Sequence, residues 1–269
     1  MEIYKLGFIG AGKLAGSVIR GLVRSKFCGS NEIIASEPSE QTRASLQKDV
    51  DAVLTTENAE VAEKADVILI GVKPGVLLSA IREISTKLDN KLVISLAAGI
   101  RISSMEKVAD ARFMRAITNT PSAVCRAATA LARGTRTTNA DVDLAREIFS
   151  AIGIVVEVDD EQIDTATALC GSAPAFVYTV IEALAKGAEK MGLGADIALT
   201  LATQTVLGAA QLAGESKLSP EELRRMVVTP GGTTAAGLVE MERLGTVNSL
   251  IAAVEAATKR GKEMAQENS

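Results

Sequence analysis

The chain has no histidine and no tryptophan, and aromatic residues make up only 3% of its 269 positions. Without histidine it cannot hold a Ser-His-Asp triad, a histidine-ligated zinc ion or an imidazole that shuttles protons. Acid–base chemistry must then come from Lys, Asp, Glu, Tyr, Thr or water. This excludes most hydrolase mechanisms.

Cysteines and basic clusters are also scarce. Cys28, Cys125 and Cys170 are far apart and form no C-x-x-C pair, which predicts reduced, mostly structural thiols in a cytoplasmic protein. The formal net charge is −4 and no run of Lys or Arg stands out, so we expect no nucleic-acid partner. The chain enters the strand-like run Leu6–Ile9 at once, without the basic and apolar regions of a secretory signal.

The longest uncharged segment, residues 197–214, is nearly long enough to suggest a membrane span. It contains three threonines and two glutamines and is rich in Ala and Gly. We therefore interpret it as a helix buried inside protein and expect no membrane partner. Because the neighbouring helices are apolar on more than one face, we expect an obligate homodimer with helix 195–213 near its centre. A helix packed wholly within one subunit is the alternative.

Short apolar runs alternate with amphipathic stretches over residues 1–160, which predicts a Rossmann-type, doubly wound parallel β-sheet covered on both faces. The expected strands are Lys5–Ile9, Glu32–Ser36, Val67–Val72, Leu92–Leu96, Phe113–Ile117, Thr129–Ala132 and Ile154–Val158, and the expected helices are 12–26, 39–49, 58–64, 75–88, 103–109 and 140–152. Residues 161–269 predict an all-helical domain with helices at 161–170, 173–191, 195–213, 219–227, 234–245 and 247–266.

The first predicted strand ends in a glycine turn, Gly10-x-Gly12-x-x-Ala15, that opens an amphipathic helix. Gly10 permits the tight turn, Gly12 lets the backbone approach a pyrophosphate, and Ala15 is small enough for close helix–strand packing. Because the strand precedes the turn and the helix follows it, the pattern predicts a dinucleotide site rather than an ordinary turn.

The second predicted strand ends in Ser36-Glu37, some 20 positions beyond the turn. Glu37 is placed to accept hydrogen bonds from the adenosine ribose of NADH and to repel the extra phosphate of NADPH. Ser36, Ser39 and Arg43 could instead serve that phosphate, so the choice between NADH and NADPH stays open at this point.

Two further segments lie where ligands bind in open α/β sheets, at the carboxyl ends of strands. These are Gly71-Val72-Lys73-Pro74 and Leu96-Ala97-Ala98-Gly99. Lys73 could approach the cofactor or be a surface lysine at the start of a helix.

Near the other end of the chain, Thr229–Thr234 reads TPGGTT just before a predicted helix. Its free backbone N–H groups suit a carboxylate, unless Thr233 or Thr234 simply caps the helix.

The segments GFIGAGKLA, VKPG, SLAAGI, TNTPSAV, CGSAPAFVY and TPGGTTAAGL occur in one order. Together they resemble the pyrroline-5-carboxylate reductase family over essentially the whole chain. The resemblance implies a Rossmann domain followed by a helical dimerisation domain, dimers that can assemble into decamers, and reduction of 1-pyrroline-5-carboxylate to L-proline with NADPH or NADH.

The resemblance also implies roles for individual residues. Those expected at the pyrophosphate are Ile9, Gly10, Ala11, Gly12, Lys13 and Leu14, with Asn58 near the adenosine. Those expected at the nicotinamide are Val72, Lys73, Pro74, Ala97, Ala98 and Gly99. The substrate is expected at Thr229, Gly231, Gly232, Thr233 and Thr234, with the Thr234 hydroxyl nearest the imine nitrogen as the catalytic group. The chain departs from the family at Thr229, where many members have Ser, and at Glu37, where members using NADPH tend to have Ser or Thr.

Two other functions remain open from sequence. A β-hydroxyacid dehydrogenase has a similar layout and uses a lysine on a long helix, for which Lys186 and Lys190 are available, but it leaves TPGGTT without a role. A dinucleotide-sensing protein without turnover would not need that segment either.

Overall fold

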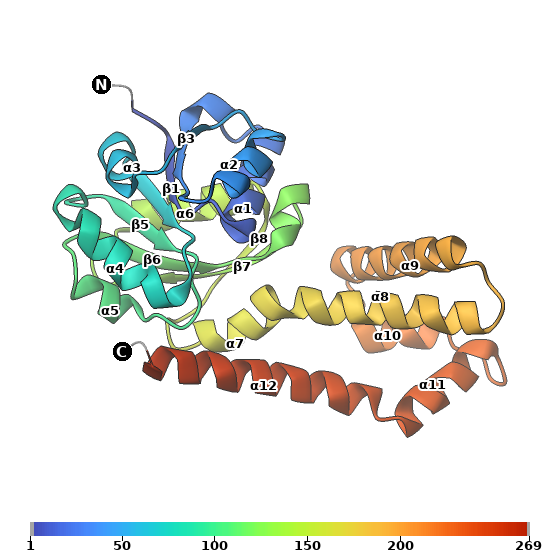
Figure 1. The fold of residues 1–269 in the computed structure, drawn as a ribbon. Helices are drawn as coiled ribbons and strands as arrows, with labels where there is room; N and C mark the ends of the chain where they lie inside the picture. The colour runs from blue at the N-terminus through green and yellow to red at the C-terminus, as the bar shows by residue number, and fades with distance from the viewer. Residues whose placement is uncertain (1–2, 268–269) are drawn as a thin grey trace. The chain divides into compact units, whose positions relative to one another are not determined.

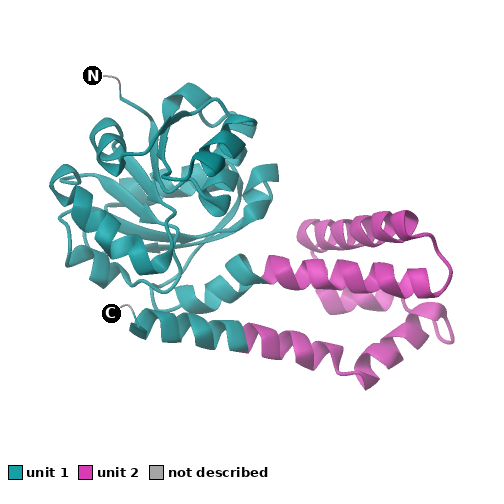
Figure 2. Ribbon diagram, viewed as in Figure 1, with its two compact units in different colours: residues 1–172, 256–269 teal, residues 173–255 magenta. Residues whose placement is uncertain are grey.

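The computed structural model describes residues 3–267, which form two compact units. The first unit comprises residues 1–172 and 256–269, and the second comprises residues 173–255 (Figure 2). The division differs from the predicted boundary near residue 160. Helix α7 (Ile163–Thr167) and the π-helical turn Ala168–Ser172 pack with the sheet unit, and the chain returns to that unit at residue 256.

The first unit is an eight-stranded sheet with helices on both faces (Figure 1). Its strands are β1 (Leu6–Ile9), β2 (Ile33–Ser36), β3 (Val53–Thr55), β4 (Val67–Ile70), β5 (Leu92–Ser95), β6 (Arg112–Ile117), β7 (Ala127–Arg133) and β8 (Gly153–Glu157). Its remaining helices are α1 (Lys13–Arg24), α2 (Glu40–Gln47), α3 (Asn58–Lys64), α4 (Pro74–Ile84), α5 (Ile102–Glu106) and α6 (Asn139–Ser150), with 3₁₀ turns at Ser30–Glu32, Ser85–Lys87 and Thr120–Val124.

The strand order is β3-β2-β1-β4-β5-β6-β7-β8. The order reverses direction between β1 and β4, and open α/β sheets bind ligands at such a switch point. Parallel pairing aligns Ile9 with both Ser36 and Ile70, and Ile70 with Ser95. The carboxyl ends of β1, β2, β4 and β5 therefore lie side by side, and the predicted cofactor residues begin there.

Alternation along β1 shows how the sequence builds both layers. Leu6 and Phe8 belong to the apolar core under α1 and α6, whereas Ile9 belongs to the core under α3 and α4. All three side chains are essentially buried. Because successive residues of a strand point to opposite faces, a fully apolar strand must be covered on both sides.

Two features of the sheet differ from the sequence prediction. Strand β3 was not expected, because three residues with an exposed Val53 give almost no alternation to detect. Strand β7 pairs antiparallel to β6, whereas the prediction was a wholly parallel sheet. The short connection through Thr120–Val124 explains the reversal, since a parallel crossover needs a dozen or more residues.

The second unit is helical. It contains α8 (Ala173–Lys190), α9 (Ala195–Glu215), α10 (Pro220–Met226) and α11 (Thr233–Arg243), and α12 (Thr246–Glu267) runs from it into the first unit. Contact between α8 and α9 is made by small residues, with Ala185, Ala198 and Ala202 buried. Most of α9 is exposed within the single chain, which disagrees with the alternative of a helix packed wholly within one subunit.

Two helical stretches, 163–190 and 195–215, are long and apolar enough to cross a bilayer by length and composition, and only 11% of each apolar window is buried.

The three cysteines are free thiols. Burial raises the pKa of the Cys28 thiol to about 11, so this side chain stays protonated at neutral pH and fills space in the core.

Candidate functional site: a dinucleotide turn and an uncapped helix

The turn after β1 has the backbone that a dinucleotide site requires. Gly10 adopts φ +81°, and a Cβ there would lie 2.8 Å from the Val72 side chain. Its N–H donates to the Ser36 carbonyl at 2.9 Å, which ties the turn to the end of β2. Gly12 has open space where its Cβ would be, so the backbone can approach a ligand closely.

Helix α1 begins directly after this turn with free donors. Its N-cap is Gly12, which provides no side chain to cap the first N–H groups, and its first turn contains no acidic residue. Lys13 is exposed, and its ammonium has no hydrogen-bond or ion-pair partner within residues 3–267. Unpaired N–H groups, the helix dipole and one cation together suit a pyrophosphate.

The third position of the motif packs as its small side chain predicts. A Cβ on Gly71, which follows β4, would lie 2.7 Å from the Ala15 Cβ. Glycine on the strand side and alanine on the helix side therefore let α1 lie close over the switch point between β1 and β4.

The end of β2 gathers the groups expected at the adenosine. The Ser36 hydroxyl donates to Asn58 Oδ1 at 2.7 Å, and Asn58 Nδ2 donates to Glu83 at 3.2 Å. Glu37 Oε1 accepts the Ser39 N–H at 3.1 Å, which holds the carboxylate at the turn. Arg43 Nη1 donates to the carbonyls of Glu37 and Pro38, at 2.6 and 2.9 Å.

The ends of β4 and β5 carry the residues expected at the nicotinamide. Lys73 is the N-cap of α4 with Pro74 in the first turn, and the lysine side chain is exposed. The Ala97 N–H donates to the Ser95 hydroxyl at 3.2 Å. Gly99 adopts φ +67°, and a Cβ there would lie 2.7 Å from the Met264 Cβ, so the end of α12 packs directly on this loop.

The TPGGTT segment lies in the second unit. Gly231 adopts φ +70°, and a Cβ on Gly232 would lie 2.4 Å from the Thr229 hydroxyl, so the loop requires both glycines. Gly232 is the N-cap of α11, with no side-chain hydrogen bond and no acidic residue in the first turn. Thr233 and Thr234 are therefore the first two residues of the helix rather than its cap, and the N–H groups there are available to an anion.

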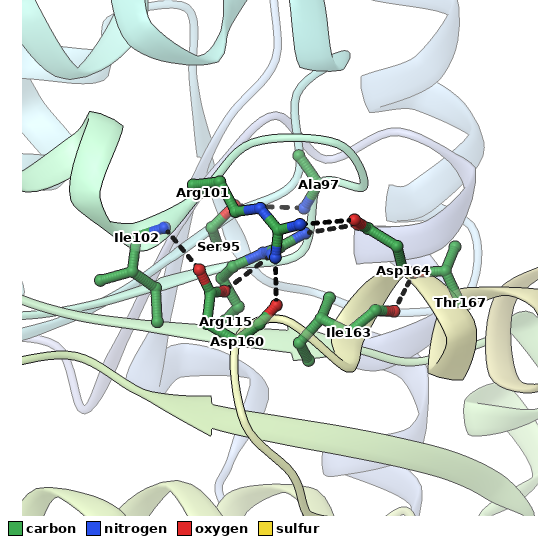
Figure 3. A network of polar contacts seen from close by, with 9 residues as sticks. All are labelled: Ser95, Ala97, Arg101, Ile102, Arg115, Asp160, Ile163, Asp164 and Thr167. Atoms are coloured by element: carbon green, nitrogen blue, oxygen red, sulfur yellow. Dashed lines mark hydrogen bonds and ion pairs between the residues drawn. The ribbon is translucent and has the colours of Figure 1, made fainter. Parts of the chain in front are cut away.

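The first unit contains a cluster of four charged residues that was not expected from the sequence (Figure 3). Arg115 on β6 is fully buried and donates to Asp160 Oδ1 at 2.7 Å, and its Nη2 lies 3.7 Å from Asp164 Oδ1. Arg101 donates to the Asp160 carbonyl at 2.6 Å and to Asp164 Oδ2 at 3.0 Å. An arginine inside the apolar run Phe113–Ile117 was the available signal, since arginine is almost never fully buried unless paired.

A glycine-rich turn at a sheet switch point, joined to a helical unit, defines a nicotinamide-dependent oxidoreductase. The chain is 39% identical to a pyrroline-5-carboxylate reductase of Arabidopsis thaliana, over 98% of this chain and 97% of that protein. It belongs to the pyrroline-5-carboxylate reductase family.

Family models and solved structures agree with this assignment. The model for pyrroline-5-carboxylate reductase dimerisation matches residues 160–264, and that for NADP oxidoreductase, coenzyme F420-dependent, matches residues 5–99. The Plasmodium falciparum pyrroline carboxylate reductase with NADP bound has a TM-score of 0.89 at 29% identity, covering 98% of this chain and 99% of that chain. The enzyme from Coxiella burnetii has a TM-score of 0.87 at 34% identity, covering 98% and 99%. The predicted family and fold class are thereby confirmed, and the second unit belongs to a self-associating domain.

Proposed function

We propose that this chain reduces 1-pyrroline-5-carboxylate to L-proline, with Thr229–Thr234 as the substrate site. The observation that carries this proposal is the uncapped N-terminus of α11, because its free N–H groups suit the substrate carboxylate. The β-hydroxyacid dehydrogenase alternative is weaker, because Lys186, a candidate acid, is exposed and paired with Glu182 at 2.9 Å.

When bound, the reduced nicotinamide supplies the hydride that adds to the imine carbon. The chain's own residues orient the two rings and manage one proton. Loop Ala97–Gly99 and Val72–Pro74 line the nicotinamide, and Ile9–Leu14 hold the pyrophosphate. The Thr234 hydroxyl donates a hydrogen bond to the imine nitrogen, or relays to it a proton from water, which needs no histidine.

A single assay separates the candidate functions. Oxidation of NADH and NADPH is followed by absorbance with 1-pyrroline-5-carboxylate, and the reverse reaction is followed with a panel of 3-hydroxy acids. We expect turnover only with the imine, with L-proline as the product. Turnover only with 3-hydroxy acids would support the dehydrogenase, and binding without turnover would support a sensor.

We further propose that NADH is the better cofactor. Glu37 is held at the end of β2 by the Ser39 N–H, whereas Nη1 of the nearby Arg43 already serves two backbone carbonyls. A carboxylate there accepts hydrogen bonds from ribose hydroxyls and repels the additional phosphate of NADPH. The NADP bound to the Plasmodium relative shows that this family also accepts the phosphorylated form.

The Glu37→Ser variant tests this choice. Removing the carboxylate should shift the ratio of kcat/KM for NADPH over NADH upward by about tenfold, equivalent to ~1.4 kcal/mol. Glu147→Ser removes the same charge from an exposed position on α6 and should leave the ratio unchanged. A wild-type enzyme that strongly prefers NADPH, or an unchanged ratio in Glu37→Ser, would contradict the proposed selectivity.

We also propose an obligate homodimer that can assemble into a decamer in the cytoplasm, with no membrane or nucleic-acid partner. Support comes from α9, where the exposed side chains of Ile197, Leu199, Leu201, Leu207 and Leu212 would bring a large apolar area into water. A partner copy accounts for that surface better than a bilayer does, because the helix also carries threonines and glutamines.

Substituting one of these leucines tests the assembly. Leu207→Glu should convert dimers or decamers to monomers at micromolar concentration, because a charge cannot be buried without a partner. Val124→Glu is matched in exposure, 52% against 54%, and lies in the other unit, so it should leave the assembly intact. Light scattering during size-exclusion chromatography measures both. A monomeric wild type would contradict the proposal.

A further inference from the structure

Arg101 holds the loop that follows β5 in place. Its two terminal nitrogens donate to the Asp160 carbonyl at 2.6 Å and to Asp164 Oδ2 at 3.0 Å. Both acceptors lie about sixty residues away in sequence, in the segment around the start of α7. The guanidinium therefore ties one end of the loop Leu96–Ile100 to a distant part of the same unit.

The acceptors of Arg101 are themselves fixed. Asp160 Oδ1 accepts a hydrogen bond from Arg115 Nη1 at 2.7 Å, and Asp160 Oδ2 accepts one from the Ile102 N–H at 3.3 Å. The side chains of Arg115 and Asp164 are fully buried, whereas that of Arg101 is 28% exposed. Figure 3 shows the Arg101 guanidinium lying across the two aspartates. The cluster balances two positive charges with two negative ones, which is the condition for burying them.

The loop is also restrained from its other side. Gly99 leaves no room for a side chain, because Met264 of α12 lies where a Cβ would be. The Ser95 hydroxyl accepts the N–H of Ala97 at the start of the loop. The segment is thus held between the charge cluster and α12, and every one of these contacts lies within the first compact unit.

We infer that Arg101 is a positioning residue for the nicotinamide end of the cofactor. The inference rests on the proposed role of Ala97–Gly99 at the nicotinamide. Arginine suits this role because its planar fork reaches a carbonyl and a carboxylate at once, which the single ammonium of lysine does not reproduce. Small misplacements of a reacting ring are costly, since an error of about 1 Å can lower a rate by ~100-fold.

The test separates the two ends of the cofactor in Arg101→Lys and Arg101→Met. ADP-ribose contains the adenosine and pyrophosphate without the nicotinamide, so calorimetry should give the same dissociation constant for both variants as for wild type. NADH binding should weaken by about threefold to tenfold. Turnover should fall by about tenfold, and the isotope effect with 4-deuterated NADH should rise, because hydride transfer becomes slower.

Arg146→Ala is the matched control. Arg146 forms an ion pair at 2.8 Å with Glu157 in the same unit, and both side chains are exposed, so all four measurements should stay at wild-type values. If Arg101→Lys lost affinity equally for ADP-ribose and NADH, Arg101 would have only a general structural role and the inference would be overturned. Unchanged NADH affinity in this variant would also overturn it. The binding measurements need no imine, so they decide this question even if 1-pyrroline-5-carboxylate proves not to be the substrate.

Discussion

Replacing Thr234 with alanine is expected to lower kcat by about 100-fold or more while leaving the dissociation constant of the cofactor within twofold. The size follows from the ~10²- to 10⁴-fold contribution of a positioned proton donor. The selectivity follows from the structure, because Thr234 is the second residue of α11 and the dinucleotide turn belongs to the other compact unit. Steady-state kinetics with 1-pyrroline-5-carboxylate and fluorescence titration of NADH measure the two quantities.

Thr234→Ser keeps the hydroxyl and loses only a methyl group, so its turnover should stay within about fivefold of wild type. This control separates the proton donor from the shape of the loop. Alanine and serine variants with equal activity would remove the hydroxyl from the mechanism. An alanine variant with wild-type kcat would do the same.

The largest stability change is expected at Asp164. Asp164→Ala should lower the free energy of unfolding by about 3–5 kcal/mol, because it leaves buried charge without compensation. Asp160 would be the one carboxylate left paired with Arg115 among residues 3–267. The Nε and Nη2 of Arg115 already lack hydrogen-bond partners in this part of the chain. Urea unfolding followed by circular dichroism measures the loss.

Asp110→Ala is the comparison that gives this number its meaning. Asp110 also pairs with an arginine, Arg136, but the side chains are 85% and 45% exposed, so water replaces the lost partner. Exposed pairs are worth at most about 1 kcal/mol. If the Asp164 and Asp110 variants were equally stable, the cluster in Figure 3 would contribute no more than a surface ion pair.

The fold could be predicted from sequence wherever local chemistry determines it. Gly10, Gly12 and Ala15 each have a steric reason to be small. Gly10 has a positive φ, Gly12 leaves open space beside the backbone, and Ala15 lies close to Gly71. Apolar runs located seven of the eight strands. The direction of β7 was harder to predict from the sequence. Its antiparallel pairing with β6 depends on a short connection whose geometry the residues alone did not reveal.

The site was predictable in part for the same reason. TPGGTT indicated either an anion site or a capped helix, and only the backbone shows that Gly232 is the N-cap and that neither threonine caps. The charge cluster escaped prediction, because Arg101 and Asp164 are 63 residues apart and nothing local pairs them.

The packing of Gly99 against Met264 has a consequence for how the protein is made. The sheet unit is discontinuous in the chain, since its second segment begins only at residue 256. A ribosome must therefore synthesise all of residues 173–255 before the loop Leu96–Ile100 can gain its support from α12. Until then the growing chain holds an unfinished domain, and the helical unit must emerge before the sheet unit that precedes it can be completed.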